Sequence, residues 1–419
     1  MRRVTGPCAA AAVGVLLLAA GCSGDDTADP APSTSASPSQ SASPSTSSPT
    51  PGETTTTEPA PEPEPRSFTV AMSGDVLLHD GTWDTARADA ARAGGSGLDF
   101  DPMFADVRSP VSSVDLAICH LETPLAPPQG PFGSYPIFNA PPQVVPGLLH
   151  TGYDVCSTAS NHSVDQGGEG IVRTLKTLNR AGMPHFGTAL SLKSSRLPHI
   201  MDVAGVRVGL LSYTYGTNGI PLPSDMPWSV PLIDPDQITA DASRAKRAGA
   251  EVVIVALHFG TEYSTAPDAY QIDIVDQITR SPDIDLVYGH HAHVPQPFDK
   301  VHGTWVAYGL GNFIAQQETS IPDTYRGLTA RFELTETPAG DFRVSDAAYL
   351  PTMITPYVAG DPRMRVLDAA AALHDPSTPD ALRPSLRPSL RAAVDEVTAA
   401  AEMLGADKLG LHLWRSWAR

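Results

Sequence analysis

Blocks of apolar and polar residues alternate along the chain from Ser67 onward. Short, nearly continuous apolar runs predict buried strands, and longer stretches with apolar residues every third or fourth position predict helices. The predicted strands are residues 68–72, 116–119, 155–158, 206–213, 251–257, 284–287, 304–308, 331–334 and 342–349. The predicted helices are residues 167–181, 239–247 and 269–279. Strands alternating with helices indicate an α/β fold with covered sheets.

The pattern changes in the last 60 or so residues. Pro384 and Pro388 interrupt it, and an amphipathic spacing then predicts a helix that ends at Gly405. The apolar positions of this helix are Leu390, Val394, Val397, Ala401 and Leu404. We therefore expect a main domain over residues 67–358 and a helical C-terminal tail over residues 359–419, packed on that domain. Trp414, Arg415, Trp417 and Arg419 could instead touch a membrane surface.

The N-terminal residues predict export. Residues 1–22 combine a positive start with a short apolar run, and their end resembles a bacterial lipoprotein signal in which Cys22 becomes the lipidated residue. An ordinary signal peptide is the alternative. Residues 23–66 are rich in Ser, Thr and Pro and predict a disordered linker. We expect a lipoprotein on the outer face of the cytoplasmic membrane, within the cell envelope.

Charge restricts the partners of the folded part. The formal net charge is −18, which argues against nucleic acid, because a nucleic-acid backbone requires Lys and Arg patches. A substrate phosphate would have to be held by metal rather than by a basic field. The two cysteines of the folded part, Cys119 and Cys156, lie in apolar strands, and buried thiols are favoured over a disulfide.

Three histidines follow one predicted strand directly. His290, His291 and His293 come after the apolar run 284–287, and a neutral imidazole is a common metal ligand. In a His-x-His sequence the two side chains share one side of an extended segment, which favours His291 and His293 and leaves His290 open. A solvated His-rich turn is the alternative interpretation.

Polar residues also end the other predicted strands. They are Asp75, Glu122, Asn161 with His162, and His258. Ligands of open α/β sheets bind at the carboxyl ends of the strands. Two carboxylates, an amide oxygen and several imidazoles are the mixed ligands of a two-metal hydrolase site, which activates water and binds a phosphate oxygen.

Six segments carry a resemblance to a known family. In order they are Gly-Asp-Val-Leu-Leu, His-Leu-Glu-Thr-Pro, Ser-Asn-His-Ser-Val-Asp-Gln-Gly, His-Phe-Gly-Thr-Glu-Tyr, Gly-His-His-Ala-His-Val and Gly-Leu-Gly-Asn-Phe. Residues 67–315 resemble the CapA family, which is named for poly-γ-glutamate capsule synthesis and is related to calcineurin-like metallophosphoesterases. The resemblance implies a four-layer α/β sandwich of the metallophosphoesterase type, with its metal site at the strand ends.

The resemblance also implies roles for individual residues. Glu122 would bridge two divalent ions of Mn, Fe or Zn, and His162 would be the general acid for the leaving group. The implied ligands are Asp75, Glu122, Asn161, His258, His291 and His293, with His79 and His290 as further candidates. His79 could instead contact substrate.

One position departs from the family, and several others are expected around the ligands. His120 stands where CapA proteins usually have Asn, which adds an imidazole near the site. We expect Asp165, Glu262, Tyr263 and Asn312 to support the ligands or face substrate. Asn312 fits a turn former after Gly311 equally well.

Three functions remain open at this point. The leading one is metal-dependent phosphoesterase-type chemistry in the synthesis of a capsule or another envelope polymer, within a polymer-synthesis complex and on an anionic polymer or a phosphate-containing substrate. The second is a non-catalytic surface scaffold that binds or exports an anionic polymer, although such a scaffold would not need His162. A nucleotidase ranks lower, because the sequence offers no recognisable aromatic clamp for a base.

Overall fold

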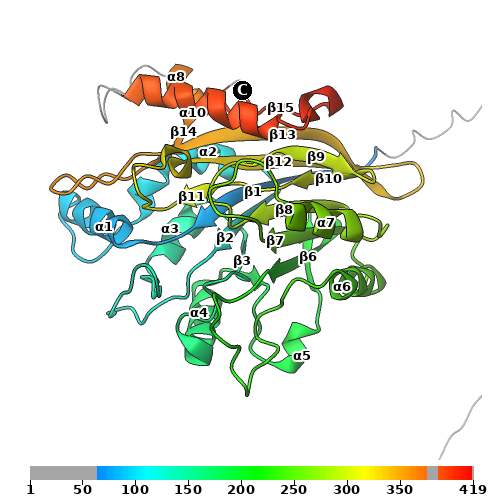
Figure 1. Cartoon of the computed structure of the whole chain (residues 1–419), viewed down its shortest axis with the longest axis horizontal. Coiled ribbons are helices and arrows are strands. Elements are labelled where there is room, and N and C mark those ends of the chain that lie inside the picture. Colours follow the sequence, from blue (N-terminus) through cyan, green and yellow to red (C-terminus); the bar gives the residue numbers. More distant parts are fainter. Residues whose placement is uncertain (1–63, 375–385, 418–419) are drawn as a thin grey trace, which may run out of the picture. The chain divides into compact units, whose positions relative to one another are not determined.

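Two β-sheets face each other in the computed structural model, which describes residues 64–374 and 386–417 (Figure 1). In the first sheet, β1, β2, β3 and β4 run parallel, β12, β13 and β14 continue antiparallel from β1, and β11 and β15 pair with β1 and β13. Its strands are β1 (Ser67–Val76), β2 (Leu116–Leu121), β3 (Val155–Ser157), β4 (His185–Phe186), β11 (Asn312–Ile314), β12 (Arg326–Glu336), β13 (Phe342–Ile354), β14 (Val366–Asp368) and β15 (His412–Leu413).

The second sheet has the order β5-β6-β7-β8-β10-β9, with a parallel centre from β6 to β10. Its strands are β5 (His199–Val203), β6 (Val206–Thr214), β7 (Val252–His258), β8 (Leu286–His290), β9 (Phe298–Val301) and β10 (Thr304–Ala307). The centre of this sheet is nearly all apolar, as expected for parallel strands that are buried on both faces.

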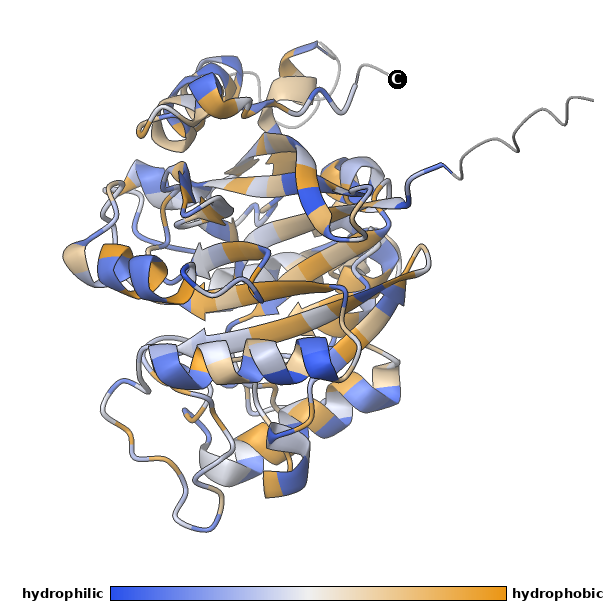
Figure 2. Ribbon diagram, turned by 90° about the vertical axis from the view of Figure 1, so that its right-hand side faces the viewer, coloured by the Kyte–Doolittle hydropathy of each residue, from blue (hydrophilic) through white to orange (hydrophobic). Residues whose placement is uncertain are grey.

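Helices cover the outer faces of both sheets. The helices are α1 (Asp80–Arg92), α2 (Arg108–Val111), α3 (Val144–Thr151), α4 (Gly167–Ala181), α5 (Leu192–Ser195), α6 (Pro235–Arg247), α7 (Ala269–Ile278), α8 (Ala369–His374) and α10 (Leu386–Ala401). Helices α1, α3 and α4 share a buried cluster with the first sheet, and α6 and α7 share one with the second. A third cluster fills the space between the sheets. The strands are mainly apolar, whereas the helices carry polar residues on one side (Figure 2). The predicted α/β fold with covered sheets is confirmed.

Some predicted elements have shifted bounds. Helix α4 has the predicted bounds and ends at Gly182, which has a left-handed φ of 75°. Helix α6 begins four residues earlier than predicted, because the Asp234 carboxylate caps it and Pro235 occupies its first turn. Strand β8 extends to His290, so the first histidine of the run belongs to the strand.

The tail packs on the first sheet. Helix α10 begins before Pro388, which lies in its first turn. Proline is tolerated there because a backbone N–H in the first turn forms no hydrogen bond within the helix. The predicted interruption at Pro388 is therefore wrong, and Leu404 lies beyond the helix and is 46% exposed. Trp417 stacks on His374 with a ring-centroid distance of 4.4 Å. Together with β14 and β15, these contacts tie the tail to the domain.

The predicted signal peptide with Cys22, the linker up to residue 63, Pro384 and Arg419 lie outside the described residues. Arg66, which we expected in the linker, forms ion pairs with Glu251 and Glu336. No helix within residues 64–374 and 386–417 is long and apolar enough to cross a membrane.

The prediction of two free thiols is wrong, because Cys119 and Cys156 form a disulfide. The two residues face each other on neighbouring strands β2 and β3, with Cα atoms 4.5 Å apart. Strand register brings them together, and the sequence alone does not give that register.

Removal of this disulfide should destabilise the domain. The bond closes a loop with a sequence separation of 37 residues, for which loop entropy predicts about 4 kcal/mol. A Cys119→Ala/Cys156→Ala variant should therefore unfold at lower urea concentration than the oxidised wild type. Equal midpoints for the two proteins without reductant would contradict this role.

Candidate metal centre

The strand ends of both sheets meet at one place. Asp75 on β1 is the register partner of His120 on β2 and of Asn312 on β11. In the second sheet His258 on β7 is the register partner of His290 on β8. Hydrogen bonds cross between the sheets at this point, from His290 to Asp75 and between His120 and His258. The predicted strand ends therefore converge.

A glycine allows β1 to approach its neighbour at this place. Gly74 precedes Asp75, and a Cβ atom at position 74 would lie only 2.1 Å from the carbonyl oxygen of Gly311. The Asp75 amide donates a 2.9 Å hydrogen bond to the same oxygen. Any larger residue at position 74 would displace Asp75 from the site.

Asp75 is fully buried among histidines. One carboxylate oxygen lies 2.7 Å from Nδ1 of His290, and the other lies 3.2 Å from Nδ1 of His293 and accepts from the His291 amide at 3.3 Å. Burial opposes ionisation, but the hydrogen bonds from His290 and His293 outweigh it and hold the pKa of Asp75 well below its usual value. Asp75 is therefore an ionised carboxylate in the site.

Glu122 has the opposite environment. It is 1% exposed, and neither carboxylate oxygen has a hydrogen-bond partner among the described residues. The nearest imidazole nitrogens are Nε2 of His258 at 3.8 Å and Nε2 of His293 at 3.9 Å from Oε1. Burial raises the pKa of Glu122 well above its usual value. A buried carboxyl without a partner is costly, so this position fits a carboxylate that binds cations.

The histidine run holds its rings on a strained turn. His291 and His293 have φ angles of 84° and 58°, in the left-handed region that residues with a side chain rarely adopt. Such strain clusters at functional sites. Ring nitrogens of His290 (Nε2) and His291 (Nδ1) are buried without a hydrogen-bond partner in the described part of the chain.

Three groups of side chains could each hold a metal ion. In each group, one potential ligand atom per residue lies within 4.8 Å of the others. The groups are Asp75, Glu122 and His293; Asp75, His120 and His290; and Glu262, His291 and His293. Glu262, which we expected only to support the ligands or face substrate, thus lies close enough to be a ligand itself.

His258 links both sheets through Asn161. Its Nε2 lies 2.8 Å from the amide oxygen of Asn161, and its Nδ1 lies 3.1 Å from Nε2 of His120. The His120 ring also stacks on the His290 ring, with centroids 3.9 Å apart. His120 therefore connects two candidate ligands.

His162 lies beside the ligands with one nitrogen fixed. Its Nδ1 is 2.8 Å from Oδ2 of Asp165, which also accepts a hydrogen bond from the Phe138 amide. The Phe138 ring meets the His162 ring edge-on, with centroids 4.7 Å apart. Nδ1 is thus held by Asp165, which leaves Nε2 for a proton transfer.

Three predicted residues remain, Asn312, Tyr263 and His79, and their contacts differ. Asn312 is fully buried and holds His293 through contacts with its Nδ1 at 3.0 Å and its carbonyl oxygen at 3.2 Å, so it does more than form a turn. Tyr263 is 42% exposed, with its ring 6.3 Å from that of His293. His79 is in none of the three groups, and its Nδ1 lies 3.3 Å from the Gln316 amide.

Two residues of the site escaped the sequence analysis. The Tyr215 ring lies 4.6 Å from that of His291, and the Tyr215 hydroxyl donates to Asn218. Asn218 in turn accepts from the Asn161 side chain at 3.2 Å. Both follow β6, for whose end the sequence analysis named no polar residue. With Tyr263, Tyr215 gives the site two partly exposed aromatic rings.

No Lys or Arg occurs in the segments that carry the candidate ligands. These segments are residues 73–86, 116–166, 258–279, 281–299 and 301–325. Within these segments the polar side chains that an anionic group could meet are carboxylates, amides, hydroxyls and imidazoles. This agrees with the expectation that metal, rather than a basic field, would hold a phosphate.

The residues present fit divalent metal ions. The unpartnered Glu122 carboxyl, the unpartnered nitrogens of His290 and His291 and the ionised Asp75 are nitrogen and oxygen donors of the kind that bind Zn, Mn and Fe. Burial lowers the pKa of His79 to about 4 and that of His291 to about 3, so these imidazoles are neutral at physiological pH.

The buried histidines predict acid instability of the metal-free protein. Since an unfolded histidine titrates near pH 6.5 and His79 near 4 in the fold, unfolding takes up a proton between these values. The free energy of unfolding should fall by up to about 1.4 kcal/mol per pH unit for each such histidine as pH drops through this window. Chemical unfolding in chelator at several pH values measures this slope. His79→Gln should lower the slope by the contribution of one proton, up to about 1.4 kcal/mol per pH unit. An unchanged slope in His79→Gln would contradict this contribution of His79.

The fold and the site define an α/β sandwich with a candidate metal centre where the strand ends of its two sheets meet. Residues 69–317, more than half of the chain, match the family described as bacterial capsule synthesis protein PGA_cap, and the chain belongs to this family. The predicted membership of the CapA family is confirmed.

Two curated relatives carry the CapA name. The capsule biosynthesis protein CapA of Bacillus anthracis is 30% identical over 183 residues, which are 43% of this chain and 44% of that protein. The PGA biosynthesis protein CapA of Bacillus subtilis is 28% identical over 200 residues, 47% of this chain and 51% of that protein. The chain thus matches about half the length of these relatives. A solved calcineurin-like phosphoesterase from Bacillus subtilis is 15% identical with a TM-score of 0.43, covering 68% of this chain and 90% of that one.

Proposed function

We propose that the protein is a metal-dependent phosphoesterase-type enzyme that acts in the synthesis of a poly-γ-glutamate capsule or another envelope polymer. The observation that carries this proposal is Glu122, a buried carboxyl with no hydrogen-bond partner in the described structure, beside the imidazoles of His258 and His293. Divalent ions there would activate water and stabilise charge on a phosphoryl oxygen.

The residues of the chain would have distinct tasks. Glu122 would bridge two ions, and the other five ligands would be Asp75, Asn161, His258, His291 and His293. Asn312 would orient the His293 ring through its contact with Nδ1. His162 would give a proton from Nε2 to the leaving group, because Asp165 holds its Nδ1.

The sequence supports a proposal for the location and the partners of the protein. A lipid on Cys22 would anchor the chain to the outer face of the cytoplasmic membrane, and the linker would hold the domain away from it. We further propose that the protein works with a polymer-synthesis complex, on an anionic polymer or a phosphate-containing substrate. The names of its relatives, capsule biosynthesis and PGA biosynthesis proteins, support this assignment.

A panel of phosphate substrates tests the enzymatic proposal. The metal-loaded protein should hydrolyse a generic phosphodiester or phosphomonoester, and His291→Ala should reduce the rate because it removes a ligand. A 5′-nucleotide belongs in the panel, since Tyr215 and Tyr263 offer exposed rings beside the site. Metal-loaded wild type without activity on any member would favour the scaffold instead.

A further inference from the structure

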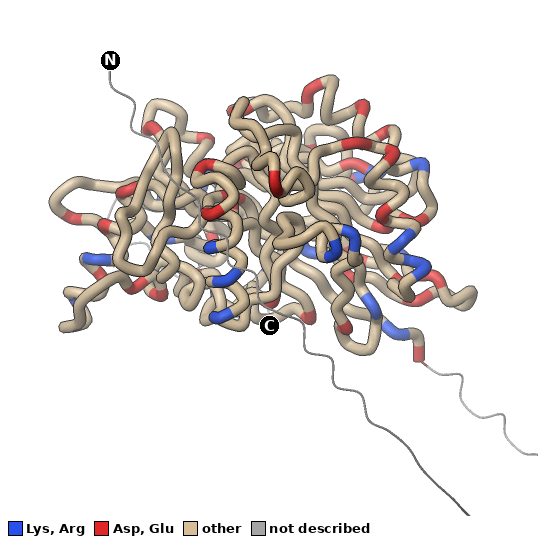
Figure 3. The backbone as a smooth tube through the Cα atoms, turned by 90° about the horizontal axis from the view of Figure 1, so that it is seen from below, with Lys and Arg blue, Asp and Glu red and all other residues tan. Residues whose placement is uncertain are grey.

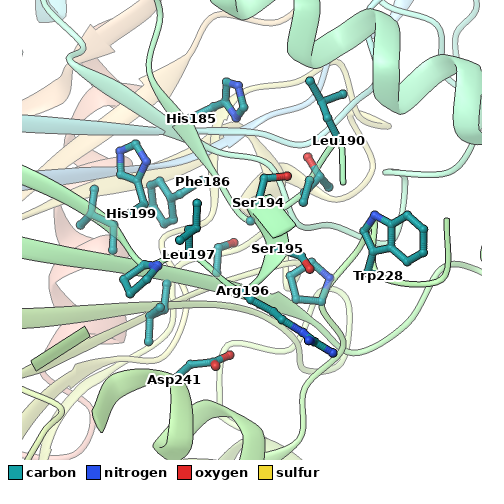
Figure 4. Close-up of a pocket in the computed structure, with 18 of the residues that line it drawn as sticks. His185, Phe186, Leu190, Ser194, Ser195, Arg196, Leu197, His199, Trp228 and Asp241 are labelled. Carbon is teal, nitrogen blue, oxygen red and sulfur yellow. The ribbon is translucent and has the colours of Figure 1, made fainter. Parts of the chain in front are cut away.

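A cavity of about 620 Å³ lies apart from the candidate metal centre, between the edge strands β4 and β5 of the two sheets. Its size is typical of ligand sites. In Figure 4, His185 and His199 lie on one side of this cavity, and Trp228 and the Arg196 guanidinium lie on another. None of these four residues has a part in the proposed chemistry of the metal centre.

Several polar atoms of the cavity lack partners. Nδ1 of His185, Nε2 of His199 and Nε1 of Trp228 are buried without a hydrogen bond in the described structure. Burial also lowers the pKa of both histidines, so their rings are neutral near pH 7. Buried polar groups in proteins are nearly always paired. Three ring nitrogens in the wall of the cavity are therefore without a partner.

The cavity continues into a basic groove. A second hollow of about 920 Å³ along α4 shares Asn179 with it, and we call the two together the basic groove. Five basic side chains line this groove against the three acidic ones Glu169, Asp225 and Asp241. The basic ones are Arg173, Lys176, Arg180, Arg196 and Arg244.

This balance is the reverse of that in the whole chain, where 46 acidic residues outnumber 28 basic ones. Within the described residues, Lys176 and Arg196 form no ion pair, whereas Arg244 pairs with Asp241. Figure 3 views this side of the molecule from below, with the Lys and Arg positions in blue. Lys176 and Arg196 are exposed, so both charges are open to an anionic ligand.

The groove and the metal centre share a wall. Thr188 lines the cavity, and its hydroxyl lies 2.7 Å from that of Thr158, shortly before Asn161 in the chain. Ser212 and Tyr213 of β6 also line the cavity, and Tyr215 of the same segment lies against His291. A chain bound in the groove would thus lie close to the site.

We propose that the basic groove binds a segment of a polycarboxylate chain, of the amide-linked glutamate type. The cations match its carboxylates, and the exposed side chains of Leu190 and Leu197, which line the cavity, match its methylene groups. This assignment rests on the proposed polymer class. It also accounts for polymer recognition by a protein whose candidate metal site carries no Lys or Arg.

Binding of a labelled poly-γ-glutamate oligomer to the full chain tests the assignment. Fluorescence anisotropy is measured in chelator, so that the metal centre contributes no bound ions. Arg196→Glu should raise Kd at least tenfold, a change of about 1.4 kcal/mol. The matched control is Arg108→Glu, because Arg108 is exposed and lies on α2, outside the groove. It should change Kd less than twofold.

Three results would overturn the assignment. They are no binding by the wild type, equal losses in Arg196→Glu and Arg108→Glu, and tighter binding of polyphosphate than of the polycarboxylate. Metal content is measured in the same preparations before chelator is added, to separate this inference from the enzymatic proposal. If the protein holds no metal but its polymer binding still depends on Arg196, the groove assignment stands and the enzymatic proposal is wrong. If the protein holds metal but does not bind the polymer, only the groove assignment is wrong.

Discussion

A Glu122→Gln variant is expected to bind less divalent metal than the wild type and yet to be more stable when metal is absent. The metal-free wild type buries a carboxyl that has no hydrogen-bond partner among the described residues. Its raised pKa means that folding opposes its ionisation above pH 4.5, so the free energy of unfolding falls as pH rises. An amide at this position does not ionise, and the stability gain should grow between pH 5 and 8.

Saturating metal should reverse the order of stability. Ions at a hundred times Kd stabilise the wild type by about 2.7 kcal/mol, and Glu122→Gln should lose most of this. Thermal unfolding with and without Mn²⁺ or Zn²⁺ measures both effects, with Glu318→Gln as the control because Glu318 is an exposed carboxylate outside the three groups. Equal stabilisation of Glu122→Gln and wild type by metal would exclude Glu122 as a ligand.

A His162→Ala variant is expected to keep its metal and to lose activity by about 10²–10⁴-fold. The loss should be largest for a phosphodiester with an alkyl leaving group, because an alkoxide must be protonated as it departs. A nitrophenyl ester should lose much less, since nitrophenolate leaves without a proton. This dependence on the leaving group separates an acid from a residue that only supports the fold.

Two further variants sharpen the assignment of His162. Asp165→Asn should share part of the loss, because the Asp165 carboxylate holds Nδ1 of His162. His150→Ala is the control, since that histidine is exposed on α3 and contacts Asp101. Unchanged hydrolysis of the alkyl ester by His162→Ala would favour the non-catalytic scaffold over an enzyme.

Much of the fold follows from the sequence, because long apolar runs and helical spacing are local signals. Helix α4 has the predicted bounds, and the central strands β1, β2, β6 and β7 lie where apolar residues indicated them. The short strands β4, β14 and β15 were not predicted, because two or three residues carry no periodicity and pair only through tertiary contacts.

The site was predictable as a set of strand ends, but its internal contacts were not. Asp75, Glu122 and His258 are each polar residues after apolar runs, which is a signal in the sequence. The bond between Asp75 and His290 depends on how the two sheets face each other. The disulfide between Cys119 and Cys156 depends on strand register. Tyr215 and Asn218 follow β6 in a loop with no motif around them.

The metal content of the purified protein tests the central claim most directly. Mass spectrometry of the wild type, after incubation with Mn²⁺, Fe²⁺ or Zn²⁺ and removal of free metal, should find about two ions per chain, as in two-metal hydrolases. His291→Ala should hold fewer ions, and Arg108→Ala should hold as many as the wild type. A wild type that binds no more metal than His291→Ala would contradict the account.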